Sequence, residues 1–213
     1  MITESQRLDI LHAIRLRGLV EVAELARLVG LPQQIITAQI QLEAGRGLLI
    51  RHSGRLSGWA LSPAGRAEGE TLLGVELDRD GDRATVEMSY REFIGMNSEV
   101  LSICSDWQIR MVDGATMVND HNDVDHDTAV LARLVDFHER AVDMLERLVS
   151  GSARFDGYPR RLSLARGRII EGETEWLTRS TIDSYHTIWF ELHENLLATL
   201  GRSRTEEYNQ RSR

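Results

Sequence analysis

The sequence predicts a mainly α-helical chain in two parts: three helices with a β-hairpin first, then a larger, all-helical part. Three observations predict this. Apolar residues recur at helical spacing through most of the chain, a glycine- and serine-rich stretch at 52–58 separates two short apolar runs, and a charged segment at 78–83 divides the chain. We therefore expect an N-terminal domain over 1–77, a helical domain over 85–201 and a flexible tail over 202–213.

The first part is a series of short elements closed by turn residues. Helices are predicted over 6–17 and 22–29, because Gly18 and Gly30 end the two apolar patterns. A third helix begins at Pro32, a favoured first-turn residue, and runs to about residue 44. Residues 48–51 and 59–61 are predicted strands around a loop. Ser62-Pro63 then opens a fourth helix that runs to about residue 76, since a hydroxyl cap precedes a proline.

The order helix, helix, helix, strand, loop, strand, helix is that of a winged helix-turn-helix. Two segments resemble the MarR group of regulators: Val22-Ala23-Glu24-Leu25-Ala26 with Gly30-Leu31, like that family's second helix and turn, and Leu61-Ser62-Pro63-Ala64-Gly65-Arg66, like its L-T-x-x-G-R segment after the wing. The resemblance covers about a third of the chain and implies a winged-helix transcriptional regulator. In the second part, the segment WFELHENLLATLG at 189–201 and the N-D-H-x-D run at 119–123 resemble the C-terminal domains of uncharacterised winged-helix regulators. This resemblance does not identify a ligand.

One position departs from the family pattern. Glu43 stands three residues after Ile40, where such helices usually place a core leucine. We therefore expect the third helix to be rotated or to end irregularly.

Charge is distributed unevenly along the chain. The net charge is −8, but residues 1–70 hold eight arginines and seven carboxylates, whereas residues 71–213 hold 17 arginines and 26 carboxylates. A neutral first part is compatible with DNA binding if its arginines cluster on one face.

The composition favours a cytoplasmic protein without membrane contact. No apolar run approaches the roughly 20 residues of a membrane helix, and the first residues lack the pattern of a signal peptide. Cys104 is the only cysteine, which excludes an intrachain disulfide and a thiolate zinc site.

The helix from Pro32 is the expected reader of double-stranded DNA, because the second helix of a helix-turn-helix lies in the major groove. Ile36 and Ile40 would face the core, which leaves the opposite side to Gln33, Gln34, Thr37 and Gln41. A glutamine amide matches adenine, and the methyl of Thr37 or Ala38 could touch thymine. Arg46 and the hairpin residues Arg51, His52 and Arg55 would contact the DNA backbone or minor groove. The alternative is a winged-helix adaptor that binds proteins and never touches DNA.

Helices are predicted over 87–108, 128–149, 159–171 and 180–200, with loops over 113–127 and 151–158. His138 is expected as a satisfied core or interface histidine. The run 119–127, which contains His121 and Asp123, is dense in metal-ligand side chains. It is either a site for a small-molecule effector or a divalent metal such as Zn²⁺, Fe²⁺ or Mn²⁺, or a solvated loop with carboxylates at a helix start.

A small-molecule pocket is the second expectation for this part. His186 and His193, with Glu194, could meet His121 or Asp123 across the core; the alternative is a helix-packing network. Trp107 and Arg110 would suit a carboxylate-bearing ligand, although core packing with a surface arginine explains them equally well.

These expectations describe a homodimeric DNA-binding regulator in which a bound effector shifts the spacing of the two DNA-binding heads. A metal-dependent enzyme is disfavoured, because the sequence has no nucleophile elbow, no phosphate-binding loop and no H-E-x-x-H pair.

Overall fold

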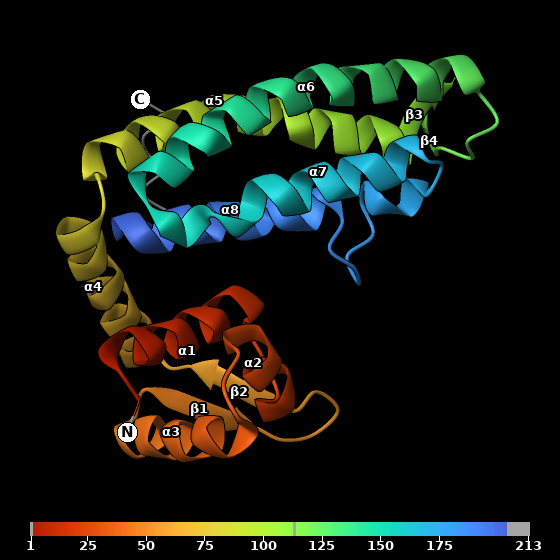
Figure 1. Ribbon diagram of the computed structural model, residues 1–213. Helices are drawn as coiled ribbons and strands as arrows, with labels where there is room; N and C mark the ends of the chain where they lie inside the picture. The colour runs from red at the N-terminus through yellow and green to blue at the C-terminus, as the bar shows by residue number, and fades with distance from the viewer. Residues whose placement is uncertain (1, 113, 204–213) are drawn as a thin grey trace. The chain divides into compact units, whose positions relative to one another are not determined.

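Residues 2–112 and 114–203 are described by the computed structural model of the chain, drawn in Figure 1. They form two compact units, residues 2–79 with 194–203 and residues 80–193. The described residues contain eight α-helices and two small antiparallel hairpins, one hairpin in each unit. The mainly helical class is thus confirmed, but the expectation that the second part is all-helical is wrong.

The N-terminal unit has its elements in the predicted order. They are α1 (Glu4–Arg17), α2 (Val22–Val29), α3 (Gln33–Gly45), β1 (Leu49–His52), β2 (Gly58–Leu61) and α4 (Pro63–Asp80). α1 begins where Thr3 accepts a hydrogen bond from the backbone of Gln6, whose own side chain accepts from the backbone of Thr3. α4 runs four residues beyond the predicted end at Glu76.

The core of this unit lies between α1, α2, α3 and the β1–β2 hairpin. Its fully or almost fully buried members are Ile10, Leu11, Ile14, Val20, Leu25, Ile36, Ile40 and Leu49. Val20 and Trp59 exchange backbone hydrogen bonds of 3.1 and 2.8 Å, so the link between α1 and α2 adds an extended segment to the hairpin. Figure 1 draws α3 along the lower edge of this unit, with the hairpin beside it.

A close backbone approach fixes the start of α4 beside the hairpin. The Ser62 hydroxyl accepts from the backbone N–H of Gly65 and donates to the carbonyl of Gly47. A Cβ at Gly65 would lie 2.0 Å from the carbonyl oxygen of Leu48, so only glycine fits. These contacts give a physical reason for serine and glycine in the segment 61–66.

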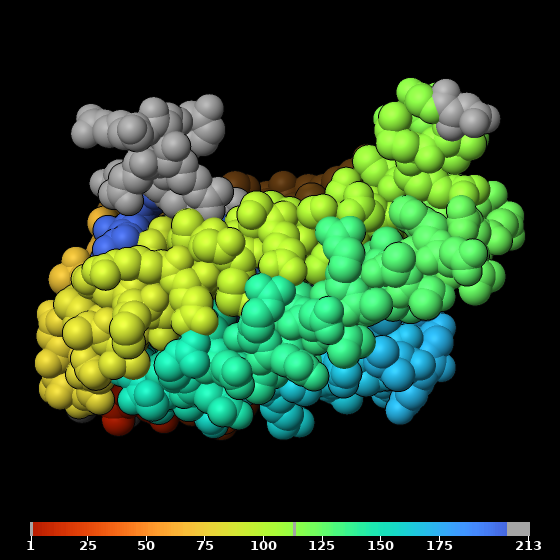
Figure 2. Space-filling model, turned by 90° about the horizontal axis from the view of Figure 1, so that it is seen from above, coloured from red at the N-terminus to blue at the C-terminus, as the bar shows by residue number. Residues whose placement is uncertain are grey.

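The second unit consists mainly of long helices packed in two layers (Figure 1). Its elements are α5 (Arg83–Gln108), β3 (Ile109–Val112), β4 (Ala115–Val118), α6 (Val124–Gly151), α7 (Gly157–Ile170) and the first part of α8 (Tyr185–Leu200), with short 3₁₀ turns at Ala153–Phe155 and Thr174–Trp176. Residues 194–200 of α8 belong to the first unit. α5 and α6 lie side by side, and the β3–β4 hairpin projects from their end (Figures 1 and 2). Its aromatic core stacks Phe93 on Trp189, with 4.5 Å between ring centroids.

Several boundaries in the second part differ from the prediction, among them the start of α5 at Arg83 rather than at residue 87. The expected loop at 113–127 contains β4, and α6 already begins at Val124, where Asp123 caps it by accepting from the backbone of His126. α8 begins at Tyr185 rather than at residue 180, with Ser184 bonded to the backbone N–H of Thr187. The helical domain was predicted to extend over 85–201, whereas the second unit spans Asp80–His193. Of the predicted tail, residues 204–213 lie outside the described part of the chain.

Candidate functional site

The outward edge of α3 carries unengaged amides. Ile36 and Ile40 are buried at 0% and 1% exposure, and the opposite side exposes Gln34 and Gln41. Gln33 is also exposed, but it precedes Ile40 by seven residues and therefore lies on the same side of the helix as the buried isoleucines, which corrects its expected place on the outward side. Within the described residues none of these three amides makes a hydrogen bond. A solvent-exposed amide can exchange its hydrogen bonds to water for hydrogen bonds to a polar partner at little cost in free energy.

Ala38 and Thr37 complete the predicted set on α3. Ala38 is exposed at the centre of the edge, whereas Thr37 is half-buried and its hydroxyl donates to the carbonyl of Gln33 at 2.9 Å. The hydroxyl is therefore satisfied within the helix, and the methyl is the part of Thr37 left to meet a partner.

Glu43 anchors α3 by a network that the sequence analysis did not foresee. Its side chain is 0% exposed, and its two oxygens accept from Nε and Nη2 of Arg7 at 2.8 and 3.1 Å. The amide of Gln39 donates to the same carboxylate, and Arg7 also reaches Glu68 on α4 at 2.9 Å. The expected irregularity of α3 is wrong: the helix is continuous to Gly45, because an arginine on α1 compensates the buried charge.

The charge state of Glu43 follows from this pairing. Burial by itself raises the pKa of the carboxyl, but the hydrogen bonds and the charge of Arg7 outweigh burial, so the pKa is lowered. Glu43 is therefore a buried carboxylate, and it holds α3 to α1.

The arginines beside α3 differ in how far they are engaged. Arg46, at the end of α3, lies 3.6 Å from Glu43. Arg51 on β1 pairs with Glu21 at 3.2 Å and lies over the ring of Trp59. Arg55, in the hairpin loop, is exposed, and no carboxylate among the described residues pairs with it. Arg55 is thus the most available cation of the predicted set.

Glu21, the residue before α2, was not singled out from the sequence. Hydrogen bonds from the Ser57 hydroxyl, at 2.6 Å, and from Arg51 lower the pKa of its carboxyl. The carboxylate compensates part of the charge of Arg51 and ties both sides of the hairpin loop to the start of α2. His52, on the same hairpin, is exposed.

An apolar groove of about 530 Å³ runs along one side of α3. Leu42 and Ile35 expose 49% and 42% of their surface there. The residues that line it are Ile2, Gln6, Leu31, Ile35, Ala38, Gln39 and Leu42. The outward side of α3 therefore carries an amide on each side of Ala38 and is apolar at one flank.

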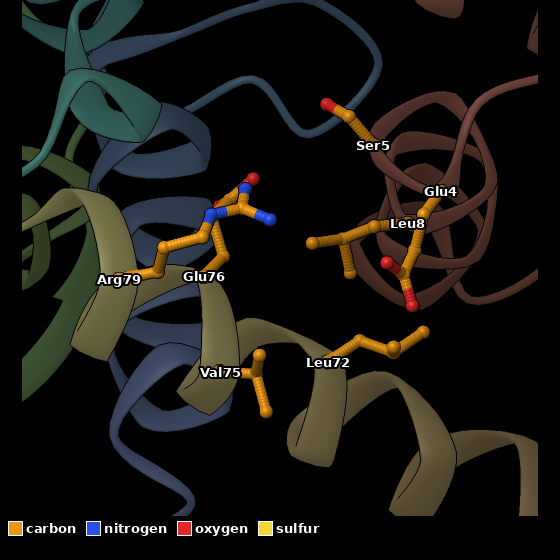
Figure 3. A pocket seen from close by; sticks show the side chains of 7 residues that line it. All are labelled: Glu4, Ser5, Leu8, Leu72, Val75, Glu76 and Arg79. Atoms are coloured by element: carbon orange, nitrogen blue, oxygen red, sulfur yellow. The ribbon is translucent and has the colours of Figure 1, made fainter.

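A second hollow in this unit lies between α1 and α4 (Figure 3). Leu8, Leu72 and Val75 form its apolar wall, and Glu4, Ser5, Glu76 and Arg79 surround it. Its volume of about 30 Å³ suits a water molecule and not a metabolite.

Four of the six predicted ligand residues gather where α5 and α6 meet the β3–β4 hairpin. The rings of Trp107 and His121 lie 4.4 Å apart, and Arg110 donates to Asp123 at 3.0 Å and to Asp120 at 3.1 Å. Because both terminal nitrogens of Arg110 already bind carboxylates of this chain, a ligand carboxylate would have to displace one of them. The arrangement fastens the hairpin to the start of α6.

Asn119 organises this cluster and was not singled out from the sequence. It is 4% exposed, and its amide donates to the carbonyl of Trp107 at 3.1 Å and to Asp127 at 2.8 Å. His121, held at a φ of 59°, places its Nδ1 2.9 Å from Asp127. No group of three or more metal-ligating side chains suited to a metal ion occurs within residues 2–112 and 114–203.

His193 and His186 do not join this cluster, which corrects the expected pocket. His193 packs against Phe93, 5.1 Å between centroids, and Phe93 precedes Trp107 by 14 residues on α5. At 1.5 Å per residue the two positions are about 21 Å apart. His186 follows Tyr185, which packs on Phe137 in the middle of α6, and burial lowers the pKa of His186.

His138 is the satisfied core histidine that the sequence predicts. It is 7% exposed, with its Nδ1 3.2 Å from the hydroxyl of Tyr185 and its Nε2 3.4 Å from that of Ser163. Burial lowers its pKa to about 4, so the ring is neutral in the folded protein at pH 7.

Comparisons with known proteins identify no relative of this chain. No protein-family model matches it, and neither curated proteins nor solved structures give a match. In the described part of the chain, none of the helices combines the length and the apolar character needed to span a bilayer.

Proposed function

We propose that this chain is a DNA-binding transcriptional regulator that acts as a homodimer and is not an enzyme. In this proposal the N-terminal unit is a winged helix of the MarR type, α3 enters the major groove and the loop of the β1–β2 hairpin contacts the flanking backbone or minor groove. The observation that carries the proposal is the set of free amides on α3, beside a hairpin whose Arg55 is unpaired within the described chain.

Two further observations support the winged-helix part. The order of the elements is the one this module requires, and the bridge between Val20 and Trp59 adds the third extended segment that braces a wing. The buried ion pair of Glu43 with Arg7 fixes α3 against α1, which gives the outward amides a defined direction.

The second unit is proposed as the dimerising part. Cross-strand pairing puts Ile109 and Met111 on the same face of the β3–β4 hairpin as Val118, and the three expose 40, 67 and 78% of their surface. Such an apolar face on a projecting two-stranded hairpin gains stability by association. A two-fold pair would place its α3 helices about 34 Å apart, one turn of DNA.

A protein-binding adaptor is the second candidate, and the apolar groove beside α3 favours it. Exposed side chains such as Ile35 and Leu42 are typical of helix faces that bind proteins. An adaptor would bind no duplex at low salt.

Selection of bound duplexes from a random pool by the full-length protein tests the proposal. We expect an enriched sequence with two half-sites, an altered sequence for Gln34→Ala, and uniformly weaker binding for Arg55→Ala with a salt slope reduced by about one. Arg91→Ala is the matched control, because Arg91 is an exposed arginine of the second unit. A pool that shows no enrichment at low salt would refute DNA binding and leave the adaptor.

A further inference from the structure

We propose that the outward edge of α3 reads A·T base pairs in the major groove, so that the duplex this chain recognises is A·T-rich at the centre of each half-site. The inference rests on the proposed function and adds the class of DNA sequence that the site accepts.

The amides of α3 are spaced for two base contacts on one face. Gln34 and Gln41 are seven residues apart, which is two helical turns and about 10 Å along the axis. That span corresponds to about three base-pair steps of 3.4 Å. A glutamine amide offers a donor and an acceptor together and pairs in the major groove with N7 and N6 of adenine.

The side chain between the two amides is apolar. Ala38 is exposed four residues after Gln34 and three before Gln41, and Ile35 and Leu42 continue an apolar stripe at its flank. The thymine C5-methyl is the apolar group that a base presents in the major groove. An edge of amides and apolar side chains is thus complementary to adenine and thymine together.

The same edge lacks the side chains that select G·C pairs. Guanine is read by arginine or lysine and cytosine N4 by a carboxylate. The sequence of α3 from Gln33 to Gly45 contains no basic residue, and its one carboxylate, Glu43, is fully buried and held by Arg7. Among the glutamines of α3, Gln39 is the one whose side-chain amide makes a hydrogen bond, which it donates to the carboxylate of Glu43.

An A·T preference could also arise in the minor groove, where Arg55 would favour the narrow groove of an A-tract. Base analogues separate the two origins. Diaminopurine paired with thymine keeps the major-groove groups of A·T and adds an amino group to the minor groove. Inosine paired with cytosine looks like A·T in the minor groove and like G·C in the major groove.

The experiment measures the affinity of the full-length protein for the selected duplex and for its analogues. Replacing the half-site thymines by uracil removes their methyl groups and should weaken binding several-fold. Diaminopurine should leave the affinity within about twofold, and inosine·cytosine should lower it on the order of tenfold per pair. Gln34→Arg should change one selected A·T pair to G·C, whereas Gln108→Ala, an exposed glutamine of the second unit, should change nothing.

Each remaining outcome overturns a stated claim. A selected sequence with G·C pairs under α3, or an affinity that follows the minor-groove groups and ignores uracil, refutes A·T reading and leaves DNA binding intact. A pool without enrichment refutes the proposed function itself, and with it this inference.

Discussion

The buried carboxylate of Glu43 allows a quantitative test of what positions α3. Arg7→Met removes both hydrogen bonds to Glu43 and leaves the carboxylate with Gln39 and with Arg46, which lies 3.6 Å away. Stranding one member of a buried ion pair costs 3–5 kcal/mol, and the nearby Arg46 favours the lower end, about 3 kcal/mol.

The double variant Arg7→Met/Glu43→Leu should recover most of that loss. Replacing a buried pair by apolar side chains of similar volume is often neutral, so we expect unfolding free energy within about 1 kcal/mol of the parent. Glu68 loses Arg7 in both variants, but its side chain is 39% exposed and therefore contributes little. The unfolding free energy of the single variant Glu43→Leu should lie between those of Arg7→Met and the double variant, since Arg7 keeps its ion pair with Glu68.

The sign of the pH dependence follows from the lowered pKa of Glu43. Its stabilisation is present above the pKa of the unfolded state and is lost as pH falls through the lower, folded value. In Arg7→Met the carboxyl of Glu43 has lost its cation and is protonated more easily. The difference in unfolding free energy between this variant and the parent should therefore become smaller as pH falls from 7 to 4.

The assay is hydrogen exchange of the peptide 33–45 in the full-length protein, read by mass spectrometry, with urea unfolding followed by circular dichroism as a second measure. If Arg7→Met costs less than about 1 kcal/mol, or the double variant is no more stable than Arg7→Met, Glu43 is not a buried charge that depends on Arg7.

Three further predictions concern single side chains. Gly65→Ala should cost about 3 kcal/mol, because its Cβ would meet the Leu48 carbonyl at 2.0 Å; Gly69→Ala on the same helix meets nothing within 4 Å and should not destabilise. His138 is neutral in the folded protein because its pKa is about 4, so the free energy of unfolding of the second unit should fall by up to about 3 kcal/mol as pH falls from 7 towards 4. Urea titrations read by tryptophan fluorescence measure this loss, and His138→Gln should reduce it. Burial raises the pKa of Cys104 to about 12, so its thiol should react with a thiol reagent about a hundredfold or more slowly in the native protein than in the urea-unfolded chain. Fast reaction of the native protein would contradict its burial.

The N-terminal elements were predictable because each has a local signal. Gly18 and Gly30 end helices at positive φ, and the pair Ser62 and Gly65 marks the start of α4. The partner of Glu43 was not predictable, because Arg7 precedes it by 36 residues and no local pattern links the two positions. The sequence therefore showed an anomaly on α3, and the tertiary contact explains it.

The β3–β4 hairpin was missed although a signal existed. Asp-Gly at 113–114, between Ile109–Val112 and Ala115–Val118, is a strong hairpin dipeptide, and the polar residues that follow masked it. The expected meeting of His193 with His121 failed for another reason. Helical spacing tells which side of α8 is buried, but not which part of α5 it meets.

The distribution of charge explains why the proposed DNA-binding protein has to bind DNA as a dimer. In the N-terminal unit Arg7, Arg15 and Arg51 are bound to carboxylates, so Arg55 remains as an unpaired cation within the described residues of the predicted interface. Each phosphate contact contributes affinity by releasing counterions, and a reader with few such contacts binds weakly as a monomer. Two linked copies double the phosphate contacts and convert the second binding event into an intramolecular one. On this proposal the affinity for DNA depends on how the acidic second unit associates, and the sequence preference depends on α3.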